Sequence, residues 1–382
     1  MGMSPPPTPP SGASKVEDYR PGGYHPVVLG DVFYNGQYKV IRKLGEGSYS
    51  TVWLAHDLRN NMYVAIKIMG AKHTTQLIDE FEHRGPNSVH NCLVFEPMGP
   101  SFKPRRMEMK IRYPYWMAKS ILQQSLQSLA FLHENGITHG AFQPGNMLFS
   151  LSDINSKPED ELRQKEDVQA GSISPPVQRL DGKQDKWAPP YLCIAQPLVY
   201  PTDYTEGFKI KSSDMGGAYF LKKPPAKPLT LVGLRPPDFV LTGAVNETFD
   251  IWSFGCLVLE LVTGQPLFCV PWYPSESERD DDYLLSLTAG LGALSDHLHK
   301  HWKTSSLYFT PERKLYNCLL GGMAGGEEPL MNEQLSMEEL FDQIGPVLVR
   351  RILQYDPAKR PSAAELLRDP WFFENGIGSG SS

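Results

Sequence analysis

The sequence predicts an α+β protein of two lobes, a small strand-rich lobe followed by a larger helical one. Between Tyr38 and Phe95, short runs of β-branched and aromatic residues are separated by turn residues, which is typical of strands. From Tyr115 onward, apolar residues recur mostly at spacings of three and four, which is the helical period. A chain of 382 residues can bury a substantial core, as one two-lobed domain or as two domains.

Five strands are expected in the first lobe, at residues 38–44, 50–55, 63–68, 77–81 and 92–95. The second lobe is expected to open with a helix from Tyr115 to Asn135, which Gly136 stops. Further helical stretches are expected over 250–264 and within 346–368. Residues 153–190 are mostly charged or polar, which predicts a solvated insert or long loop.

Composition excludes several classes of function. A net charge of −6 leaves no sign of direct nucleic-acid binding, and no apolar run approaches the ~20 residues that span a membrane. The five cysteines are odd in number and form no C-x-x-C pair, which argues against a disulfide framework or a zinc site. The N-terminus lacks the apolar core of a signal peptide, so we expect a reducing compartment, cytoplasmic or nuclear.

A glycine-rich turn lies between the first two predicted strands, as Gly45-Glu-Gly47 followed by Ser50 and Val52. Glycines let backbone N–H groups approach phosphate oxygens, although a plain hairpin turn is the alternative. A dinucleotide-binding loop would run from a strand into a helix, whereas this one runs from strand to strand. The context therefore favours a loop that covers nucleotide phosphates.

The third strand carries Val64-Ala-Ile-Lys67, which fits the lysine-bearing strand of kinases. A lysine that merely extends from the strand end into solvent is the alternative. With the glycine-rich loop in place, Lys67 is predicted to contact phosphate.

The run from His139 to Asn146 matches the spacing of a kinase catalytic loop, H-R-D-x-x-x-x-N. Ala141 stands at the position of the aspartate that accepts the substrate proton, and a methyl group cannot do so. Gln143 replaces the lysine that usually supports the transferred phosphate. Asn146, and Asp214 of the later Asp-Met-Gly run, are predicted to hold Mg²⁺, although a D-x-G run alone is usually a turn.

These motifs in this order resemble a eukaryotic protein kinase, and within that superfamily the SR-protein kinases of the CMGC group, which phosphorylate serines in Arg/Ser-rich proteins. The resemblance covers about residues 16–373. The subfamily marks are the long insert and the segments at 17–25, 77–81, 92–96 and 360–371.

The resemblance implies a kinase domain at 16–373, with an N-lobe at about 38–98, a C-lobe at about 102–373 and the polar insert at about 153–190. Residues 1–15 and 374–382 would be flexible tails. ATP and Mg²⁺ would be the cofactors, with Phe95 as the gatekeeper beside the adenine. The nucleotide would contact Leu44, Gly45, Gly47, Ser50, Val52, Ala65, Lys67 and the backbone of Glu96 to Met98.

Three further expectations come from the resemblance. Asp250 would cap the backbone of the catalytic loop, and Asp238 would form a buried pair with Arg360. Arg/Ser-rich proteins would be substrates or partners, attracted by the acidic residues between Glu276 and Asp282. A solvated acidic loop is the alternative for that cluster.

The sequence also departs from the family pattern beyond Ala141 and Gln143. Only Ile68 to Gln76 separate the lysine strand from the next one, too few for the αC helix that should carry a glutamate to Lys67. The small lobe would then expose one face of its sheet. The join after Gly99 is abrupt, and the region 331–350 looks short for the last helices.

Three functions are consistent with this sequence. The first is a Ser/Thr protein kinase whose turnover is weak or absent because of Ala141. The second is a pseudokinase scaffold that binds ATP or protein partners. The third is a small-molecule phosphotransferase, because choline and aminoglycoside kinases carry a similar H-G-D-x-x-x-x-N loop. The Asp250-Ile-Trp-Ser and Arg360-Pro-Ser-Ala runs argue against the third.

Overall fold

The computed structural model describes residues 16–20, 23–47, 50–69, 78–101, 113–151, 153–177, 186–198, 207–314 and 346–373. The chain divides into two compact units. Unit 1 is built from residues up to Ser101 together with Leu148–Lys209, and unit 2 from Phe102–Met147 together with the chain from Ile210 onward. The predicted insert therefore folds with the first unit.

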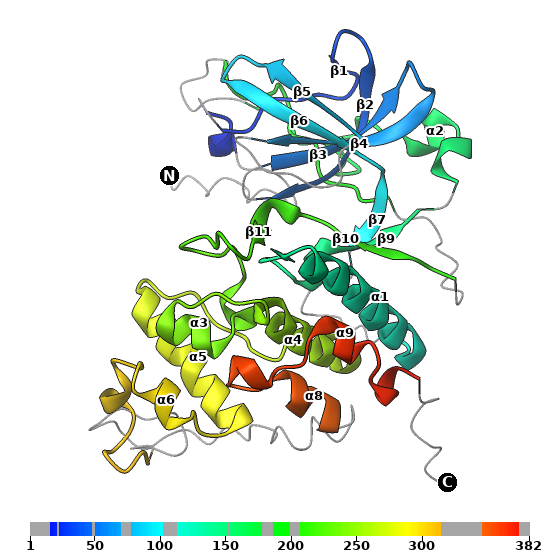
Figure 1. The fold of residues 1–382 in the computed structure, drawn as a ribbon. Helices are drawn as coiled ribbons and strands as arrows, with labels where there is room; N and C mark the ends of the chain where they lie inside the picture. Colours follow the sequence, from blue (N-terminus) through cyan, green and yellow to red (C-terminus); the bar gives the residue numbers. More distant parts are fainter. Residues whose placement is uncertain are drawn as a thin grey trace, which may run out of the picture. The chain divides into compact units, whose positions relative to one another are not determined.

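Unit 1 is built on a six-stranded antiparallel sheet in the order β1-β2-β3-β4-β6-β5 (Figure 1). All five predicted strands are present, and β1 is an additional short one. Asn61 turns the chain between β3 and β4 with a φ of 49°. The strands are β1 (Val32–Phe33), β2 (Tyr38–Gly47), β3 (Ser50–Asp57), β4 (Met62–Met69), β5 (Asp79–Arg84) and β6 (Val89–Phe95).

One face of this sheet is covered by segments that flank it in the sequence. Its core includes Trp53 and Ile66, both almost fully buried. The cover comes from Val27 and Phe33 before β2, and from Cys193 just after the insert. Each CH₂ group that is buried contributes about 0.8 kcal/mol to the stability of a fold, so the residues that cover this face stabilise unit 1.

The opposite face is covered by the insert as well. Ile41, Leu54 and Tyr63 of the sheet form a core cluster with Ile154 and Leu162 of the insert and with Leu198 beyond its end. The insert begins with the turn η3 (Ile154–Ser156) and the short helix α2 (Glu159–Leu162), which Figure 1 draws beside the sheet. Asn155 accepts a hydrogen bond from the Tyr63 backbone N–H at 2.8 Å.

The expectation of a solvated insert is therefore wrong for these residues, because Leu162 is fully buried. Gln164 is buried too, and its side chain accepts a hydrogen bond from the Lys43 backbone N–H at 2.9 Å along the edge of β2. The insert can pack on the sheet with few apolar residues, because the side-chain amides of Asn155 and Gln164 form hydrogen bonds to the backbone of the sheet. The expected gap at the αC helix falls on residues 70–77, outside the described residues.

Unit 2 is mainly helical, as predicted. The first helix, α1, begins after Pro114 and is followed by Gly136, whose φ is 69°. α4 is almost entirely buried, and α1 packs against both α4 and α9 (Figure 1). The helices are α1 (Tyr115–Glu134), α3 (Pro237–Thr242), α4 (Phe249–Thr263), α5 (Glu276–Leu291), α6 (Asp296–His299), α8 (Pro346–Ile352) and α9 (Ala363–Leu366).

The helical pattern expected within 346–368 is present as two short helices. Pro357 and Pro361 lie between α8 and α9, and proline cannot donate the backbone hydrogen bond that a helix interior needs. Ser362 then restarts the helix with a capping box, since its side chain accepts from the Glu365 N–H. Among the described helices, none has the length and apolar content to cross a membrane.

Short strands lie next to the predicted site residues in each unit. In unit 1, β7 (Met98–Ser101) pairs with β9 (Met147–Ser150), through Met98 opposite Ser150. In unit 2, β8 (Ile137–Thr138) pairs with β11 (Tyr219–Phe220) on either side of the predicted catalytic loop. β10 (Ile210–Ser212) leads directly into Asp214.

Candidate active site

The predicted catalytic loop is fixed by one buried carboxylate, that of Asp250 in the first turn of α4. Its two oxygens accept hydrogen bonds from the backbone N–H of His139 at 2.6 Å and of Gly140 at 3.0 Å. His133 of α1 contacts the same carboxylate through Nε2 at 3.1 Å. Because Asp250 is fully buried, these charge-assisted bonds hold the loop firmly.

Gly140 stands where the family pattern has an arginine, and the fold explains why a glycine is required. Its φ is 67°, in the left-handed region. A Cβ there would lie 2.3 Å from the carbonyl oxygen of Gly217 and 2.7 Å from the ring of Tyr219. Thr230 donates to the Gly140 carbonyl at 2.6 Å, so the chain after the Asp-Met-Gly run packs directly on the catalytic loop.

Ala141 occupies the proton-acceptor position and is only 7% exposed. A Cβ on Gly217 would lie 2.9 Å from the Cβ of Ala141, which shows how closely the two segments meet. The loop around Ala141 is thus closely packed, but the Ala141 side chain carries no atom that accepts a proton. Gln143 is partly buried and comes directly before the turn η2 (Pro144–Asn146).

His139 is a structural residue of this loop. It is fully buried, and burial lowers the pKa of its imidazole. Its Nδ1 accepts a hydrogen bond from the Ala141 N–H at 3.3 Å, so the neutral ring carries its proton on Nε2. Edge-to-face contact with Phe142, at 5.6 Å between ring centres, completes its packing.

Asn146 and Asp214, the predicted Mg²⁺ ligands, are tied together by Ser213. The backbone N–H and the hydroxyl of Ser213 both donate to the Asn146 carbonyl, at 2.7 and 2.9 Å. The Asn146 side-chain amide donates to the Ala141 carbonyl at 2.8 Å, which leaves its Oδ1 as the acceptor atom suited to a cation. Asp214 is exposed and has a left-handed backbone, with φ and ψ both 57°.

This donor set fits Mg²⁺, since an amide oxygen and an exposed carboxylate are hard ligands that leave room for water and phosphate oxygens. The described residues contain no group of three or more His, Cys, Asp or Glu side chains placed to hold a metal. A cation at Asn146 and Asp214 would therefore need oxygens from a bound phosphate, as kinases supply them.

In unit 1, strand register places the predicted nucleotide contacts on one face of the sheet. Val52 pairs with Gly45 on one side and with Lys67 on the other. Ala65 pairs with Leu54 and with Phe95, the predicted gatekeeper. Cross-strand partners point to the same face. Gly45, Val52, Ala65 and Lys67 therefore share one face of the sheet.

The remaining predicted nucleotide contacts border this face. Leu44 packs against the cluster that contains Leu54. Gly47 and Ser50 are paired and close the hairpin at its tip. Glu96 is exposed directly after β6, and Met98 opens β7. Each unit thus gathers its own share of the predicted site: the nine nucleotide contacts in unit 1, and Ala141, Gln143, Asn146 and Asp214 in unit 2.

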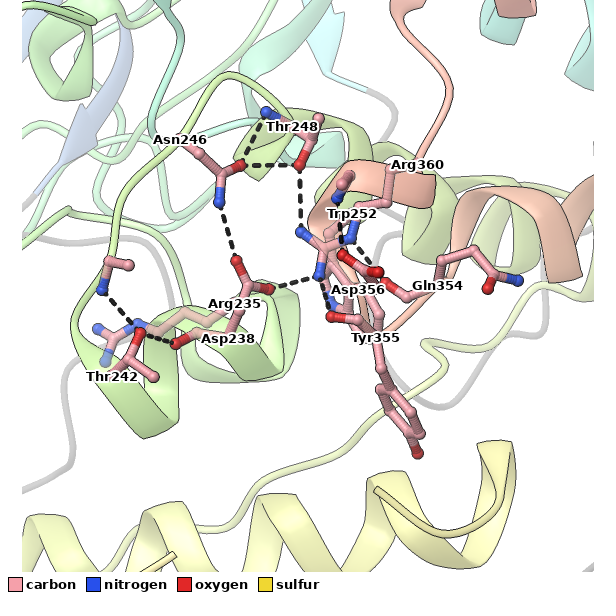
Figure 2. A network of polar contacts seen from close by, with 12 residues as sticks. Arg235, Asp238, Thr242, Asn246, Thr248, Trp252, Gln354, Tyr355, Asp356 and Arg360 are labelled. Carbon is pink, nitrogen blue, oxygen red and sulfur yellow. Dashed lines mark hydrogen bonds and ion pairs between the residues drawn. The ribbon is translucent and has the colours of Figure 1, made fainter. Parts of the chain in front are cut away.

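The predicted pair of Asp238 and Arg360 is confirmed, deep in unit 2 (Figure 2). Arg360 is 5% exposed and Asp238 is 4% exposed, and a guanidinium N–H donates to the carboxylate. The other carboxylate oxygen accepts from Asn246 at 2.9 Å. Arg360 also donates to the carbonyl of Gln354 at 2.7 Å and to the Thr248 hydroxyl at 3.3 Å.

Four contacting residues escaped the sequence analysis: His133, Ser213, Thr230 and Tyr24, whose hydroxyl donates to Gly47. The first three form polar contacts to backbone or to Asp250, and residue type alone gives no signal for such contacts. Tyr24 lies within the segment 17–25 that resembles the SR-protein kinases, but the resemblance assigned no role to this residue.

A catalytic loop capped by a helix aspartate and bonded to a D-x-G turn is the arrangement of protein kinases. The protein kinase domain family matches residues 202–372 of this chain. A crystal structure of a kinase domain aligns with a TM-score of 0.59 over 91% of this chain and 98% of that one, at 21% identity. The chain has the protein kinase fold.

The similarity reaches one family in particular. The chain is 30% identical to the serine/threonine-protein kinase SRPK of Physarum polycephalum, over 93% of this chain and 90% of that protein. It is 24% identical to SRSF protein kinase 3 of Mus musculus, over 93% and 89% of the two chains. The chain belongs to the SR-protein kinase family of Ser/Thr kinases.

Proposed function

We propose that this family member binds ATP with Mg²⁺ and transfers phosphate to protein serines weakly or not at all. The observation that carries the proposal is Ala141, a residue without a proton acceptor, inside a catalytic loop whose backbone is otherwise held by Asp250. Nucleotide binding needs the glycine-rich hairpin, Lys67 and the two oxygen ligands, and each of these is present.

The size of the expected defect follows from general chemistry. A positioned general base contributes about 10²–10⁴ in rate. Phosphoryl transfer otherwise depends on positioning and on electrostatic stabilisation of the phosphate, which Lys67, Asn146 and Asp214 would supply. Mg²⁺, when bound with ATP, neutralises charge on the β- and γ-phosphates. Loss of the base alone would therefore leave a slow enzyme rather than none.

A protein partner rich in Arg and Ser is the expected substrate or ligand, by analogy with the family. The acidic cluster of α5 supports this only in part. Asp281 is buried and accepts from the Trp302 indole N–H at 2.6 Å, so it stabilises unit 2. Glu276 lies 3.6 Å from Lys227, and Asp280 lies 3.0 Å from Arg279. Asp282 is half-buried and hydrogen-bonded to Tyr273, so the exposed Glu278 is the acid of this cluster best placed to attract arginines.

The test is transfer of labelled γ-phosphate from ATP to an Arg/Ser-repeat peptide with Mg²⁺, by the native chain and by Ala141→Asp. Transfer by the variant alone would support the proposal. Clear transfer by the native chain would refute the claim of impaired catalysis. If neither transfers phosphate while both bind ATP, the pseudokinase scaffold becomes the better description. A panel of choline and aminoglycosides tests the small-molecule alternative.

A location in the cytoplasm or nucleus accompanies this proposal. It rests on the cysteine pattern and on the family, and localisation of a tagged full-length chain tests it.

A further inference from the structure

The glycine-rich hairpin is contacted by a segment before the sheet, residues 19–20 and 23–27, here called the N-terminal strap. The hydroxyl of Tyr24 donates a hydrogen bond to the carbonyl oxygen of Gly47. Burial, followed by the nearby carboxylates of Asp18 and Glu46, raises the pKa of Tyr24 to about 12. The phenol therefore keeps its proton at physiological pH and remains a donor.

Tyr24 is held in place by its own segment. Its backbone N–H donates to the Asp18 carbonyl at 2.9 Å. Its ring meets that of Tyr19 edge to face, with 5.8 Å between centres, and Tyr19 is buried. A Cβ on Gly23 would lie 2.1 Å from the Asp18 carbonyl oxygen, so this tight turn needs glycine.

The strap is hydrogen-bonded to Asn87, which lies in the turn between β5 and β6. The buried Asn87 amide donates to the carbonyls of Arg20 at 3.1 Å and Tyr24 at 2.6 Å. Its oxygen contacts His90 Nε2 at 3.0 Å, which orients the amide. The Asn87 side chain therefore connects the β5–β6 hairpin to Tyr24, and the Tyr24 hydroxyl is hydrogen-bonded to the glycine-rich loop.

Next to Tyr24, His25 packs into the same place. It is 6% exposed, and its ring centre lies 4.5 Å from that of His83 and 5.0 Å from that of His90. A Cβ on Gly85 would lie 2.2 Å from His25 Nδ1, so the β5–β6 turn closes directly over this ring. Such close packing leaves the strap little freedom to move relative to the sheet.

The other side of the loop is held from within the sheet. Glu46, between the two glycines, forms an ion pair with Lys43 at 2.6 Å, and the Lys43 side chain is fully buried. The Lys43 ammonium lies 5.9 Å from the ring centre of Trp53. Residues 45–47 are therefore held from two sides, by Lys43 from the sheet and by Tyr24 from the strap.

We propose that Tyr24 is a positioning residue that sets the place of the glycine-rich loop for nucleotide phosphate. The inference rests on the proposed ATP binding and deepens it. Phosphate recognition by such a loop depends on the direction of its backbone N–H groups. A loop held before the ligand arrives loses less conformational entropy on binding. One hydrogen bond of this kind corresponds to a change of about 3- to 10-fold in affinity.

Two measurements on the full chain test this role: amide hydrogen exchange of residues 45–52 without nucleotide, and the dissociation constant of a fluorescent ATP analogue with Mg²⁺. The variant is Tyr24→Phe, which removes only the hydroxyl. The matched control is Tyr34→Phe, because Tyr34 lies in the same unit and stacks on Phe81 at 4.8 Å between ring centres. Asn87→Ala releases the strap without touching the loop.

For Tyr24→Phe we expect faster exchange at residues 45–52, unchanged exchange at residues 89–95, and about 3- to 10-fold weaker nucleotide binding. Asn87→Ala should also speed exchange at residues 45–52 and weaken nucleotide binding, and Tyr34→Phe should change neither quantity. Unchanged loop exchange in Tyr24→Phe would overturn the inference, whatever the nucleotide does. A native chain that binds no nucleotide would refute the proposed function instead, and loop exchange would still decide the role of Tyr24.

Discussion

Asp238 and Arg360 form a buried ion pair that joins two parts of unit 2 lying 122 residues apart in the sequence. The guanidinium also lies 5.1 Å from the ring centre of Trp252, and it donates to the carbonyls of Gln354 and Tyr355 and to the Thr248 hydroxyl (Figure 2). Each charge is thus compensated by the other and by fixed hydrogen bonds. Removing one member strands the other in a low-dielectric interior.

We therefore expect Arg360→Ala to lower the free energy of unfolding of unit 2 by about 3–5 kcal/mol. Denaturant unfolding followed by a probe of unit 2 measures this change. Lys359→Ala is the matched control, since Lys359 is the exposed neighbour of Arg360 and its loss should cost little. Equal effects of the two substitutions would contradict the importance of the pair.

A second prediction concerns the insert as part of the small unit. Leu162 is fully buried against the sheet, so Leu162→Ala should destabilise unit 1 by about 2–5 kcal/mol. Val168, in the same insert, is 46% exposed, and Val168→Ala should be nearly neutral. Thermal unfolding with a reporter in unit 1 compares them. If the insert were solvated throughout, neither variant would change the transition.

A third prediction separates two ways of restoring the family's loop. Ala141→Asp adds a carboxyl group at a position with ordinary backbone, and it should raise turnover by about 10²–10⁴. Adding Gly140→Arg should cancel this gain, because a Cβ there would lie 2.3 Å from the Gly217 carbonyl oxygen at a φ of 67°. Peptide phosphorylation by the single and double variants decides the matter. Higher activity in the double variant would be the contrary result.

The fourth prediction is a loss of stability in acid. Burial, and then the neighbouring His83 and His90, lower the pKa of His25 to about 3 from 6.5. The folded state therefore holds His25 neutral, and its contribution is complete above pH 6.5 and is lost as pH falls toward 3. Desolvation also lowers the pKa of His83, which Asp31 partly opposes. Because the pKa values of both His25 and His83 are lowered in the folded state, both histidines favour unfolding as the pH falls.

The expected loss is on the order of a few kcal/mol across that range. Melting temperatures of the native chain and of His25→Phe, measured from pH 7.5 to 5 (roughly the range in which an unfolded histidine titrates), test the prediction. The variant should show a shallower pH dependence. Parallel curves for the two proteins would argue that other groups govern acid sensitivity.

Much of this fold follows from local patterns in the sequence. Strands β2 to β6 and the helices α1 and α4 have strong periodicity and clear end signals, and all of them are present. The pair of Asp238 with Arg360 was predictable because each lies in a recognisable motif. The site residues follow in the same way, since Gly45, Val52, Ala65 and Lys67 alternate along strands whose register the hairpins fix.

Other features depend on contacts between distant segments, and no local pattern carries them. The chain after β9 packs on the sheet through Ile154, Leu162 and Leu198, which are too far apart to form a periodic signal. The need for glycine at position 140 arises only when Gly217 and Tyr219 arrive beside it. The break between α8 and α9 follows from Pro357 and Pro361, which no helix interior accommodates.

The way the insert covers the sheet also bears on how the chain is made. The six strands of the main sheet of unit 1 end with Phe95, but the residues that cover them extend to Leu198. During synthesis, the strands therefore leave the ribosome well before their hydrophobic cover, while the first part of unit 2 is still being added. Until then one sheet surface stays open to water and to other chains. A nascent chain halted soon after Ser101 should thus be a client of chaperones, and one halted beyond Leu198 should not.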